Sequence, residues 1–413
     1  MTASKPSLTR ADVLSHVRST IFTSSVEGRI GVEIEWFPVF EDDPGAYVPL
    51  ERLKRILDCT RPLPCGSTLS FEPGGQLEIS SIAGRSASAT CTAAGKDLDF
   101  VRSILSSHGI KLVGVGLDPI RPGRRVLALP RYEAMEAYFD AGWPEGRSMM
   151  RATASVHVNL DVNGIEEGAD RWRLVHAMGP TFCAAFANSA IARGSPTGWK
   201  SSRLALWQAL DPSRTLPTSP VGDPVEAWAT YALRARVMFI RHRGGAEAIQ
   251  QRMTFAQWLE QGHGLGFPDL EDLTVHLSTL FPPIRPKGWL ELRMIDALPD
   301  PWWRVPVVVA SMVYDEEAAR RIDRLVEPTA DLWEVAARQG MENELLSHTA
   351  QGVFNTALDA IERLEVDDET AAVVEAYNRK FVQKGRSPAD EQLEAWGRGS
   401  SLLELGSMEC TWT

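Results

Sequence analysis

Two glutamates lie two residues apart in the apolar stretch GVEIEWF, residues 31–37. Side chains alternate between the faces of a β-strand, so Glu33 and Glu35 share one face while Val32, Ile34 and Trp36 take the other. Two neighbouring carboxylates in apolar surroundings are unfavourable unless a cation neutralises them. The stretch is therefore compatible with two interpretations: a hard-metal site that favours Mg²⁺, or a solvent-facing edge strand.

Two later segments repeat this one-sided pattern. Residues 70–80 contain a Pro-Gly-Gly turn with Glu72 beside it, and the strand that follows turns Glu78 away from its apolar neighbours. Residues 149–161 are predicted to form one strand, in which His157 stands in a row of polar side chains opposite a row of apolar ones. An imidazole in such a row is a better ligand candidate than an isolated core histidine.

A fourth segment, residues 289–296, places Glu291 and Arg293 on one strand face and apolar side chains on the other. If the four strands pair in one antiparallel sheet, their polar faces converge into a concavity backed by helices, an α+β arrangement. Six candidate metal ligands would meet there: Glu33, Glu35, Glu72, Glu78, His157 and Glu291.

Five carboxylates and an imidazole require cations between them, so two or more Mg²⁺ ions, or Mn²⁺ ions, are expected. An arginine among the ligands indicates an anion such as a nucleotide phosphate. The sequence contains no Walker A motif, kinase glycine-rich signature, H-E-x-x-H or G-x-S-x-G. Metals and arginines would then hold the phosphates, as ATP-dependent phosphoryl transfer to a carboxylate requires.

The bulk properties are those of a soluble globular protein of 413 residues, 44% of them hydrophobic and 23% charged. A net charge of −11 argues against nucleic acid or an anionic membrane as a partner. The first ten residues show no targeting signal, and no apolar run is long enough to span a bilayer. Five cysteines without a C-x-x-C pair indicate reduced thiols, so a cytoplasmic protein is expected.

The remaining segments are mostly helical by pattern. The polar loop at residues 193–202 is predicted to be a lid or substrate loop. The chain beyond residue 301 reads as helices with interleaved acidic and basic residues, a solvated wrapping without chemistry of its own. Earlier helices are predicted at residues 8–24, 48–58, 87–108, 170–192, 224–242 and 254–262.

An ordered set of motifs across residues 25–300 resembles the plant-type glutamate–cysteine ligase family. The motifs are GVEIE at 31–35, EPGGQLE at 72–78, PRY at 130–132, TASVHVNLD at 153–161, FANS at 186–189, SSR at 201–203 and WLELR at 289–293. The resemblance implies a glutamine-synthetase-like fold, a curved and mainly antiparallel sheet wrapped by helices. It also implies one catalytic domain over residues 8–413, with the sheet core in 25–300 and helical wrapping in 301–413.

The resemblance further implies a reaction. ATP would phosphorylate the γ-carboxylate of L-glutamate, and the amino group of L-cysteine would displace phosphate to give γ-glutamylcysteine. ATP is then a substrate, and Mg²⁺ the expected cofactor. The chain length and the divergent C-terminal third are most similar to the bacterial branch that supplies γ-glutamylcysteine for ergothioneine synthesis.

Residue roles also follow from the resemblance. Glu33, Glu72 and Glu78 would hold a metal on the acceptor side. Glu35, His157 and Glu291 would hold one at the β- and γ-phosphates; plant relatives commonly have Gln where this chain has His157. Arg293 would face the transferring phosphoryl group, and Arg131 and Arg203 would bind substrate carboxylates.

Other interpretations remain open. A ligase of the same fold could join glutamate to a different amine, and clustered carboxylates with a histidine also occur in metallohydrolases. Arg293 between the ligand strands and the few His and Asp ligands argue against a hydrolase. A catalytically silent binding protein would not be expected to retain every acid of the motif set. The sequence predicts no oligomeric state.

Overall fold

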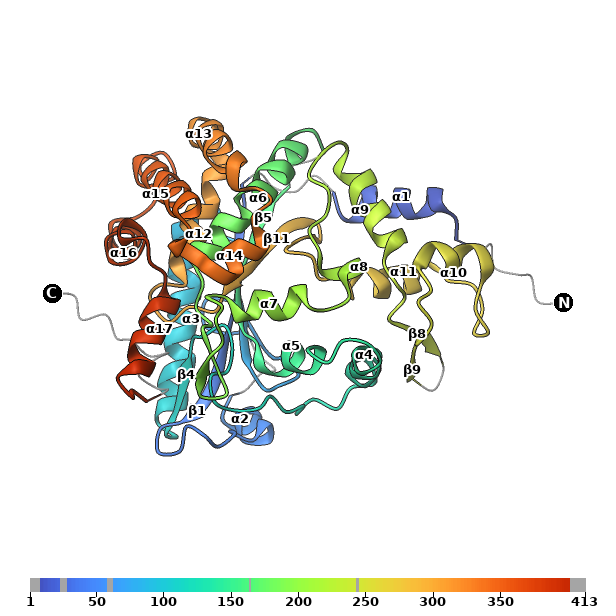
Figure 1. Ribbon diagram of the computed structural model, residues 1–413, viewed down its shortest axis with the longest axis horizontal. Coiled ribbons are helices and arrows are strands. Elements are labelled where there is room, and N and C mark those ends of the chain that lie inside the picture. Colours follow the sequence, from blue (N-terminus) through green and yellow to red (C-terminus); the bar gives the residue numbers. More distant parts are fainter. Residues whose placement is uncertain (1–7, 23–27, 58–61, 163–164, 243–244, 402–413) are drawn as a thin grey trace.

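The computed structural model describes residues 8–22, 28–57, 62–162, 165–242 and 245–401, and Figure 1 shows their arrangement. A seven-stranded sheet lies at the centre, and helices surround it. None of the helices in these ranges is long and apolar enough to cross a membrane.

The central sheet is antiparallel throughout, with strand order β10-β11-β5-β1-β3-β2, and β4 pairs with the distal end of β1. β1 is the longest strand, and its two halves have different partners: β3 and β5 along the first half, β4 along the second. The strands are β1 (Ile30–Phe40), β2 (Thr68–Phe71), β3 (Leu77–Ser80), β4 (Ile110–Val113), β5 (Ser155–Asp161), β10 (Ile284–Pro286) and β11 (Trp289–Asp296).

Alternation along β1 decides which face of the sheet is apolar. Val32, Ile34 and Trp36 are almost fully buried on one face, as their period of two predicts. The Trp36 indole donates a hydrogen bond of 2.9 Å to the Leu298 carbonyl, which fixes the strand against the chain beyond β11. Glu33 and Glu35 consequently share the opposite face, and the edge-strand interpretation of this stretch is wrong because β1 lies inside the sheet.

Helices pack against the sheet, and further helices of the C-terminal third pack outside them. α3 (Ala87–Ser106) contacts β1, β3 and β4, α6 (Ile165–Ala185) contacts β11, and α12 (Arg304–Ser311) contacts β5 and β1. Figure 1 shows the outer helices gathered on one flank. They are α13 (Glu316–Val326), α14 (Trp333–Gln339), α15 (Glu344–Asp359), α16 (Asp368–Lys380) and α17 (Pro388–Gly397).

One hydrophobic cluster joins this part of the molecule, with members from Leu8 to Val382. The described residues from 304 to 397 are mainly helical, and their helices are bonded to the core: Tyr377 on α16 donates to the Ala185 carbonyl at the end of α6, at 2.8 Å. Short 3₁₀ helices connect the outer helices at Met312–Tyr314, Glu327–Thr329, Gly340–Glu342 and Val382–Lys384.

A second apolar cluster is centred on Tyr138, Phe139 and Met150. The elements that contribute to it include α4 (Pro130–Asp140), α5 (Gly146–Ala152), β8 (Phe239–His242) and β9 (Gly245–Ala248). Further elements of this part of the chain are α7 (Ser202–Gln208), α8 (Pro212–Thr215), α9 (Pro224–Arg234), α10 (Phe255–Gln261) and α11 (Leu270–Leu277). The buried apolar side chains of α9 and α10 belong to the first cluster. The other short elements are α1 (Arg10–Thr20), α2 (Leu50–Ile56), β6 (Ile191–Ala192) and β7 (Ser195–Pro196).

Three sequence-based element predictions are wrong in part. The helix predicted for 170–192 ends at Ala185, and residues 191–192 form strand β6. Residues 149–152 belong to helix α5 rather than to the strand predicted for 149–161, because the adjacent side chains of Met149 and Met150 are both buried in one cluster, which a strand would not allow. The helix predicted for 224–242 ends at Arg234, and residues 239–242 pair with β9 as a hairpin instead.

The prediction of a lid at residues 193–202 is also wrong for its second half. Lys200 is buried and donates hydrogen bonds of 2.6 Å to Glu342 and Asp390, and Ser201 is fully buried beside Asp296. Residues 193–199 are exposed or half-exposed, and they contain the turn at 193–194 and strand β7. This segment therefore joins the sheet to the C-terminal helices.

Candidate active site

A cavity of about 420 Å³ opens between the polar face of the sheet and helices α4, α5 and α7. Side chains from five strands and three helices line it, and every site residue predicted from the sequence is among them except Glu291, which lies buried directly behind. Its polar lining consists of Glu33, Glu35, Glu72, Gln76, Glu78, Ser80, Arg131, Tyr132, Thr153, Ser155, His157, Arg203, Ser278, Arg285, Lys287 and Arg293.

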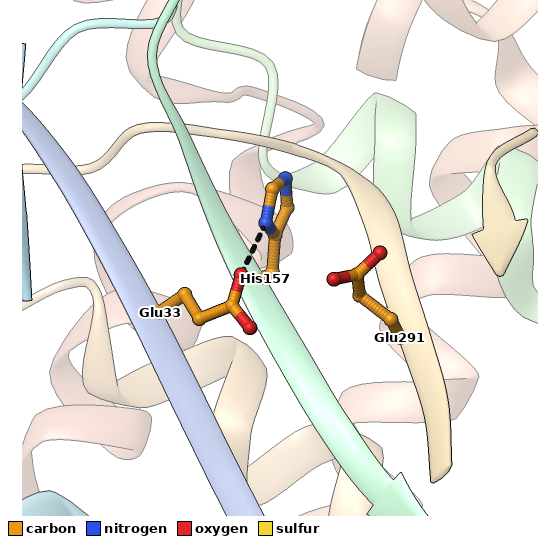
Figure 2. Close-up of side chains that lie close together, drawn as sticks. All are labelled: Glu33, His157 and Glu291. Atoms are coloured by element: carbon orange, nitrogen blue, oxygen red, sulfur yellow. Dashed lines mark hydrogen bonds and ion pairs between the residues drawn. The ribbon is translucent and has the colours of Figure 1, made fainter. Parts of the chain in front are cut away.

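Among the described residues, two groups of three side chains bring their ligand atoms within 4.8 Å of one another. The first, here called the mixed cluster, is Glu33, His157 and Glu291. Figure 2 shows these side chains projecting from three neighbouring strands toward a common point. The second, here called the carboxylate cluster, is Glu35, Glu72 and Glu78.

Strand register assembles the mixed cluster. Glu33 on β1 lies directly opposite His157 on β5, and its carboxylate meets His157 Nδ1 at 3.0 Å. The Asn159 amide, two residues along β5, donates to the other oxygen of Glu33 at 3.1 Å. Glu291 on β11 lies opposite Asn159, so it enters the same cluster from the far side of β5.

Glu291 is fully buried, and three cations contact it. Arg285 donates two hydrogen bonds, of 2.6 and 3.1 Å, while Lys287 approaches to 3.1 Å and Arg293 to 2.7 Å. Burial by itself would raise the pKa of the carboxyl group, but these positive charges hold the pKa of Glu291 well below its usual range. Glu291 therefore stays ionised inside the protein.

His157 is held in its neutral form. Burial lowers the pKa of its imidazole to about 4, and the positive charge of Arg293 acts in the same direction. Ser155 Oγ contacts His157 Nε2 at 2.8 Å and also donates to Glu35 at 2.8 Å, so one serine joins the two clusters. A neutral imidazole is the form in which histidine binds metal ions.

The carboxylate cluster has the opposite electrostatics. Burial, together with the negative charge of Glu78, raises the pKa of Glu35 to about 7. Burial and the negative charges of Glu35 and Glu78 raise the pKa of Glu72 well above its ordinary value, and burial raises that of Glu78 as well. Hydrogen bonds from Ser70 (2.8 Å) and Ser80 (3.0 Å) to Glu78 offset this only in part.

The turn between β2 and β3 fixes the position of Glu72. A Cβ on Gly74 would come within 2.0 Å of the Arg151 carbonyl, so only glycine allows the turn to approach α5 this closely. Gly75 has φ +89°, the left-handed region that favours glycine, and its N–H donates to the Glu72 carbonyl at 2.8 Å. The Pro-Gly-Gly sequence thus places a carboxylate rather than merely reversing the chain.

The arginines differ in what they contact. Arg203 is buried; its Nη2 donates to the Arg293 carbonyl at 2.9 Å, and its Nη1 has no hydrogen-bond partner among the described residues. Arg203 and Arg293 both lie over the ring of Trp207, at 6.0 and 5.5 Å from its centre. Arg131 is exposed at the rim and donates to the Ser278 carbonyl at 3.0 Å.

The structure brings the two glutamates of β1 together with other partners than the sequence-based grouping of the ligands did. That grouping placed Glu33 with Glu72 and Glu78, whereas the structure groups it with His157. The register explains the exchange: Glu35, not Glu33, lies opposite Glu78. Side-chain period alone places both glutamates on one face but does not decide which neighbouring strand each one meets.

Two cations of the site were missed by sequence reasoning, Arg285 and Lys287. Both lie on or just after β10, which pairs with β11 so that Arg285 stands opposite Glu291. The alternation of Arg285 and Lys287 ahead of the acid-bearing strand was a usable signal, because cations on one face of a hairpin strand meet the facing side chains of its partner.

The donor chemistry of the two clusters suits hard divalent cations. Three carboxylates with raised pKa values and no cation within hydrogen-bonding distance among the described residues leave negative charge that a divalent ion would neutralise. The mixed cluster offers two carboxylates and a neutral imidazole, a set that Mg²⁺ or Mn²⁺ can accept. The residues present therefore fit a metal in each cluster.

The antiparallel sheet and the surrounding helices define the class of fold, which is glutamine-synthetase-like. The glutamate–cysteine ligase of Francisella tularensis, solved in complex with AMP, is similar with a TM-score of 0.57 and 13% identity, over 93% of this chain and 88% of that one. A bifunctional glutathione synthetase from Pasteurella multocida is similar with a TM-score of 0.51 and 16% identity over 92% of this chain. This chain spans about half of that enzyme, 51%.

Sequence comparison identifies the family. Residues 29–404 match the model of glutamate-cysteine ligase family 2 (GCS2), and the chain belongs to this family. The glutamate–cysteine ligase EgtA of Mycolicibacterium smegmatis is 37% identical over 407 residues, 96% of this chain and 94% of that protein. The family and fold predicted from the ordered motifs are thereby confirmed.

The raised pKa of Glu35 predicts how the stability of the metal-free protein depends on pH. Because its folded-state pKa, about 7, lies above the ordinary value of 4.5, the unfolded chain releases this proton first, and Glu35 lowers the free energy of unfolding as pH rises between those values. The Glu35→Gln variant should therefore gain on the order of 1–3 kcal/mol relative to wild type between about pH 5 and about pH 8.

The measurement is urea denaturation of both proteins in a chelator. Glu41→Gln, an exposed acid just beyond β1, serves as control and should show no pH-dependent difference from wild type. Parallel pH profiles for wild type and Glu35→Gln would contradict the assignment of a destabilising ionisation to Glu35.

Proposed function

We propose that this chain is an ATP-dependent ligase that joins the γ-carboxylate of L-glutamate to the amino group of L-cysteine, giving γ-glutamylcysteine. The supporting observation is one cavity that combines two acid clusters with Arg293, in a member of the glutamate–cysteine ligase family. The similarity to EgtA over nearly the whole chain supports the same product. The same similarity supports a place in ergothioneine synthesis.

In this proposal the mixed cluster lies at the β- and γ-phosphates of ATP and the carboxylate cluster at the acceptor, which reverses the places of Glu33 and Glu35 given by the motif comparison. Mg²⁺ or Mn²⁺ bound in the two clusters would neutralise the charges of the phosphates and carboxylates. Lys287, half-exposed beside Glu291, lies where it can bind a phosphate oxygen.

The reaction has two steps. A γ-carboxylate oxygen of glutamate attacks the γ-phosphorus of ATP, the bond between that phosphorus and the β,γ-bridging oxygen breaks, and ADP leaves. The cysteine nitrogen then attacks the acyl carbon, the carbon–oxygen bond to phosphate breaks, and the amine loses a proton. Arg293 is the guanidinium placed to stabilise the charge on the phosphoryl group during the first step, because it stands between the two clusters.

Substrate carboxylates need positive partners on the acceptor side. Arg203 Nη1 forms no hydrogen bond among the described residues and lies 3.9 Å from Asp296, so it offers one donor; the exposed guanidinium of Arg131 at the rim offers another. Trp207, Met149 and Met150 supply apolar surface between them. We assign Arg203 and Arg131 to the carboxylates of the two amino acids on this basis.

The proposal extends to the setting of the enzyme. We propose that residues 8–413 act as one catalytic unit; residues 402–413 of that range lie outside the described residues. We also propose a cytoplasmic location, which the free thiols of Cys65, Cys91 and Cys183 favour. Cys59 and Cys410 lie outside the described residues.

The substrate assignment predicts which amine drives ATP turnover. With ATP, Mg²⁺ and glutamate, addition of cysteine should release phosphate and form γ-glutamylcysteine in equal amounts, both measured by mass spectrometry and a phosphate assay. Other amino acids at the same concentration serve as matched controls. Turnover with another amine and none with cysteine would support a ligase but contradict the assignment of cysteine as its substrate. ATP-independent hydrolysis of the product would instead indicate a metallohydrolase.

The role proposed for Arg293 predicts that its removal slows the chemical step without weakening substrate binding. Arg293→Ala should lower kcat by about 10²–10³-fold with a small effect on the KM for glutamate, because a lost transition-state contact acts on kcat. Arg324→Ala, an exposed arginine on α13, is the matched control and should keep kcat within about twofold. Steady-state kinetics on both variants makes the comparison, and an Arg293→Ala enzyme with wild-type kcat would refute the role.

A further inference from the structure

A second cavity of about 420 Å³ lies on the outer side of α6, against the loop 217–220 and the start of α14. None of the residues that line it also lines the catalytic cavity. Its other wall comes from the end of α13 and the 3₁₀ helix that follows. The volume falls within the range of about 300–1,000 Å³ that is usual for small-molecule sites.

Two buried polar side chains in this wall lack partners. His176 is 4% exposed and Thr218 3% exposed, and both line the cavity. Neither His176 Nε2 nor Thr218 Oγ1 has a hydrogen-bond partner in the described part of the chain. An unsatisfied buried polar atom costs about 1–3 kcal/mol, so two beside one cavity indicate a ligand or solvent molecule that satisfies them.

The hydrogen-bonding role of His176 is fixed. Its Nδ1 lies 2.7 Å from the Trp172 carbonyl, which can only accept, so Nδ1 carries the proton. Burial lowers the pKa of the imidazole to about 4, and the ring is therefore neutral near pH 7. Its Nε2 then presents a lone pair, which requires a donor from the ligand.

The walls are apolar, flat and rigid. Trp333 faces the cavity together with Pro217 and Pro220. A Cβ on Gly179 would lie 2.0 Å from the Trp333 ring, so the indole is closely packed on α6. The Trp172 indole donates to the Ser219 carbonyl at 3.0 Å and holds the loop in place. Such surfaces favour a ring over a flexible chain.

The rim is acidic. Arg173 pairs with Asp323. No cation in the described ranges forms a salt bridge with Glu327 or Asp331, the other two acids of the rim. Two uncompensated carboxylates beside an apolar cavity favour a positively charged ligand over an anion.

We propose that this cavity is a second ligand site, which takes a small ring-bearing cation with an N–H donor for His176. The cation lies toward Glu327 and Asp331, and the ring lies between Trp333 and the two prolines. The site is independent of the proposed ligase reaction. It stands behind α6 and α14, which contact β11 and α7, the elements that carry Glu291 and Arg203.

The probe for this site is benzamidine, a flat ring with a cationic amidinium that carries N–H donors. Phenyltrimethylammonium has the same ring and charge without a donor, and benzoate has the same ring with the opposite charge. Binding to the full chain is measured by isothermal titration calorimetry without nucleotide or amino acids. We expect saturable binding of benzamidine, and affinities at least about tenfold weaker for the other two compounds.

Variants locate the bound probe. His176→Phe keeps a ring and removes the acceptor, and should weaken benzamidine binding about tenfold or more. Thr218→Val tests the second unpartnered atom, and Asp331→Asn the acidic rim. Glu362→Gln on the surface, far along the chain, controls for net charge. Glu72→Gln controls for a cation held in the acidic catalytic cavity, and neither control should change the affinity.

The outcomes separate clearly. Loss of binding in His176→Phe with retention in Glu72→Gln supports the site, whether or not the protein has ligase activity. Absence of saturable binding would mean that the cavity holds only solvent and would overturn the proposal. Equal binding to wild type and His176→Phe, or loss in Glu72→Gln, would place the probe elsewhere. Thermal denaturation establishes whether each variant is folded. If His176→Phe does not fold, the same comparison of benzamidine binding is made with Thr218→Val.

Discussion

The main constraint on the site is the mutual repulsion of three carboxylates, those of buried Glu35 and partly buried Glu72 and Glu78. Their ligand atoms lie within 4.8 Å of one another, and in the part of the chain that the structure describes the side chains that donate hydrogen bonds to them are serines rather than cations. Such an arrangement raises the pKa values of all three groups and opposes folding at neutral pH. It persists because β1 lies in the middle of the sheet and because the Gly74–Gly75 turn can approach α5. The fold thus keeps uncompensated negative charge at a position where a divalent cation can bind.

The mixed cluster begins at Glu33, two residues before Glu35 on β1, and its negative charges are compensated by nearby donors and cations. Glu291 already meets three cations, and Glu33 meets His157 and Asn159. A phosphate chain that enters here could share Arg285, Lys287 and Arg293 with Glu291, whereas an amino-acid carboxylate would find only negative neighbours in the carboxylate cluster unless a metal were bound. The electrostatics of the two clusters therefore suit donor and acceptor respectively, with β1 between them.

Sequence reasoning identified most of this site because its residues lie on strands of period two with one apolar face. Four of the five acids, His157 and Arg293 were readable in this way, and Glu72 stood beside a Pro-Gly-Gly turn. Pairing was not readable: the exchange of Glu33 and Glu35 follows from register with β3 and β5, which one sequence does not specify. Arg285 and Lys287 were missed because their role depends on β10 folding back onto Glu291. Similarly, tertiary packing of Met149 and Met150 overrode the strand pattern there.

We propose that Glu35, Glu72 and Glu78 together hold a divalent cation. The most direct measurement is anomalous diffraction from crystals of the protein grown with Mn²⁺ and a non-hydrolysable ATP analogue. The account predicts an anomalous peak with carboxylate oxygens of all three glutamates at about 2.0–2.3 Å, and a second at Glu33, His157 and Glu291. A structure with nucleotide bound, in which the three glutamates hydrogen-bond to one another and no peak lies between them, would contradict it.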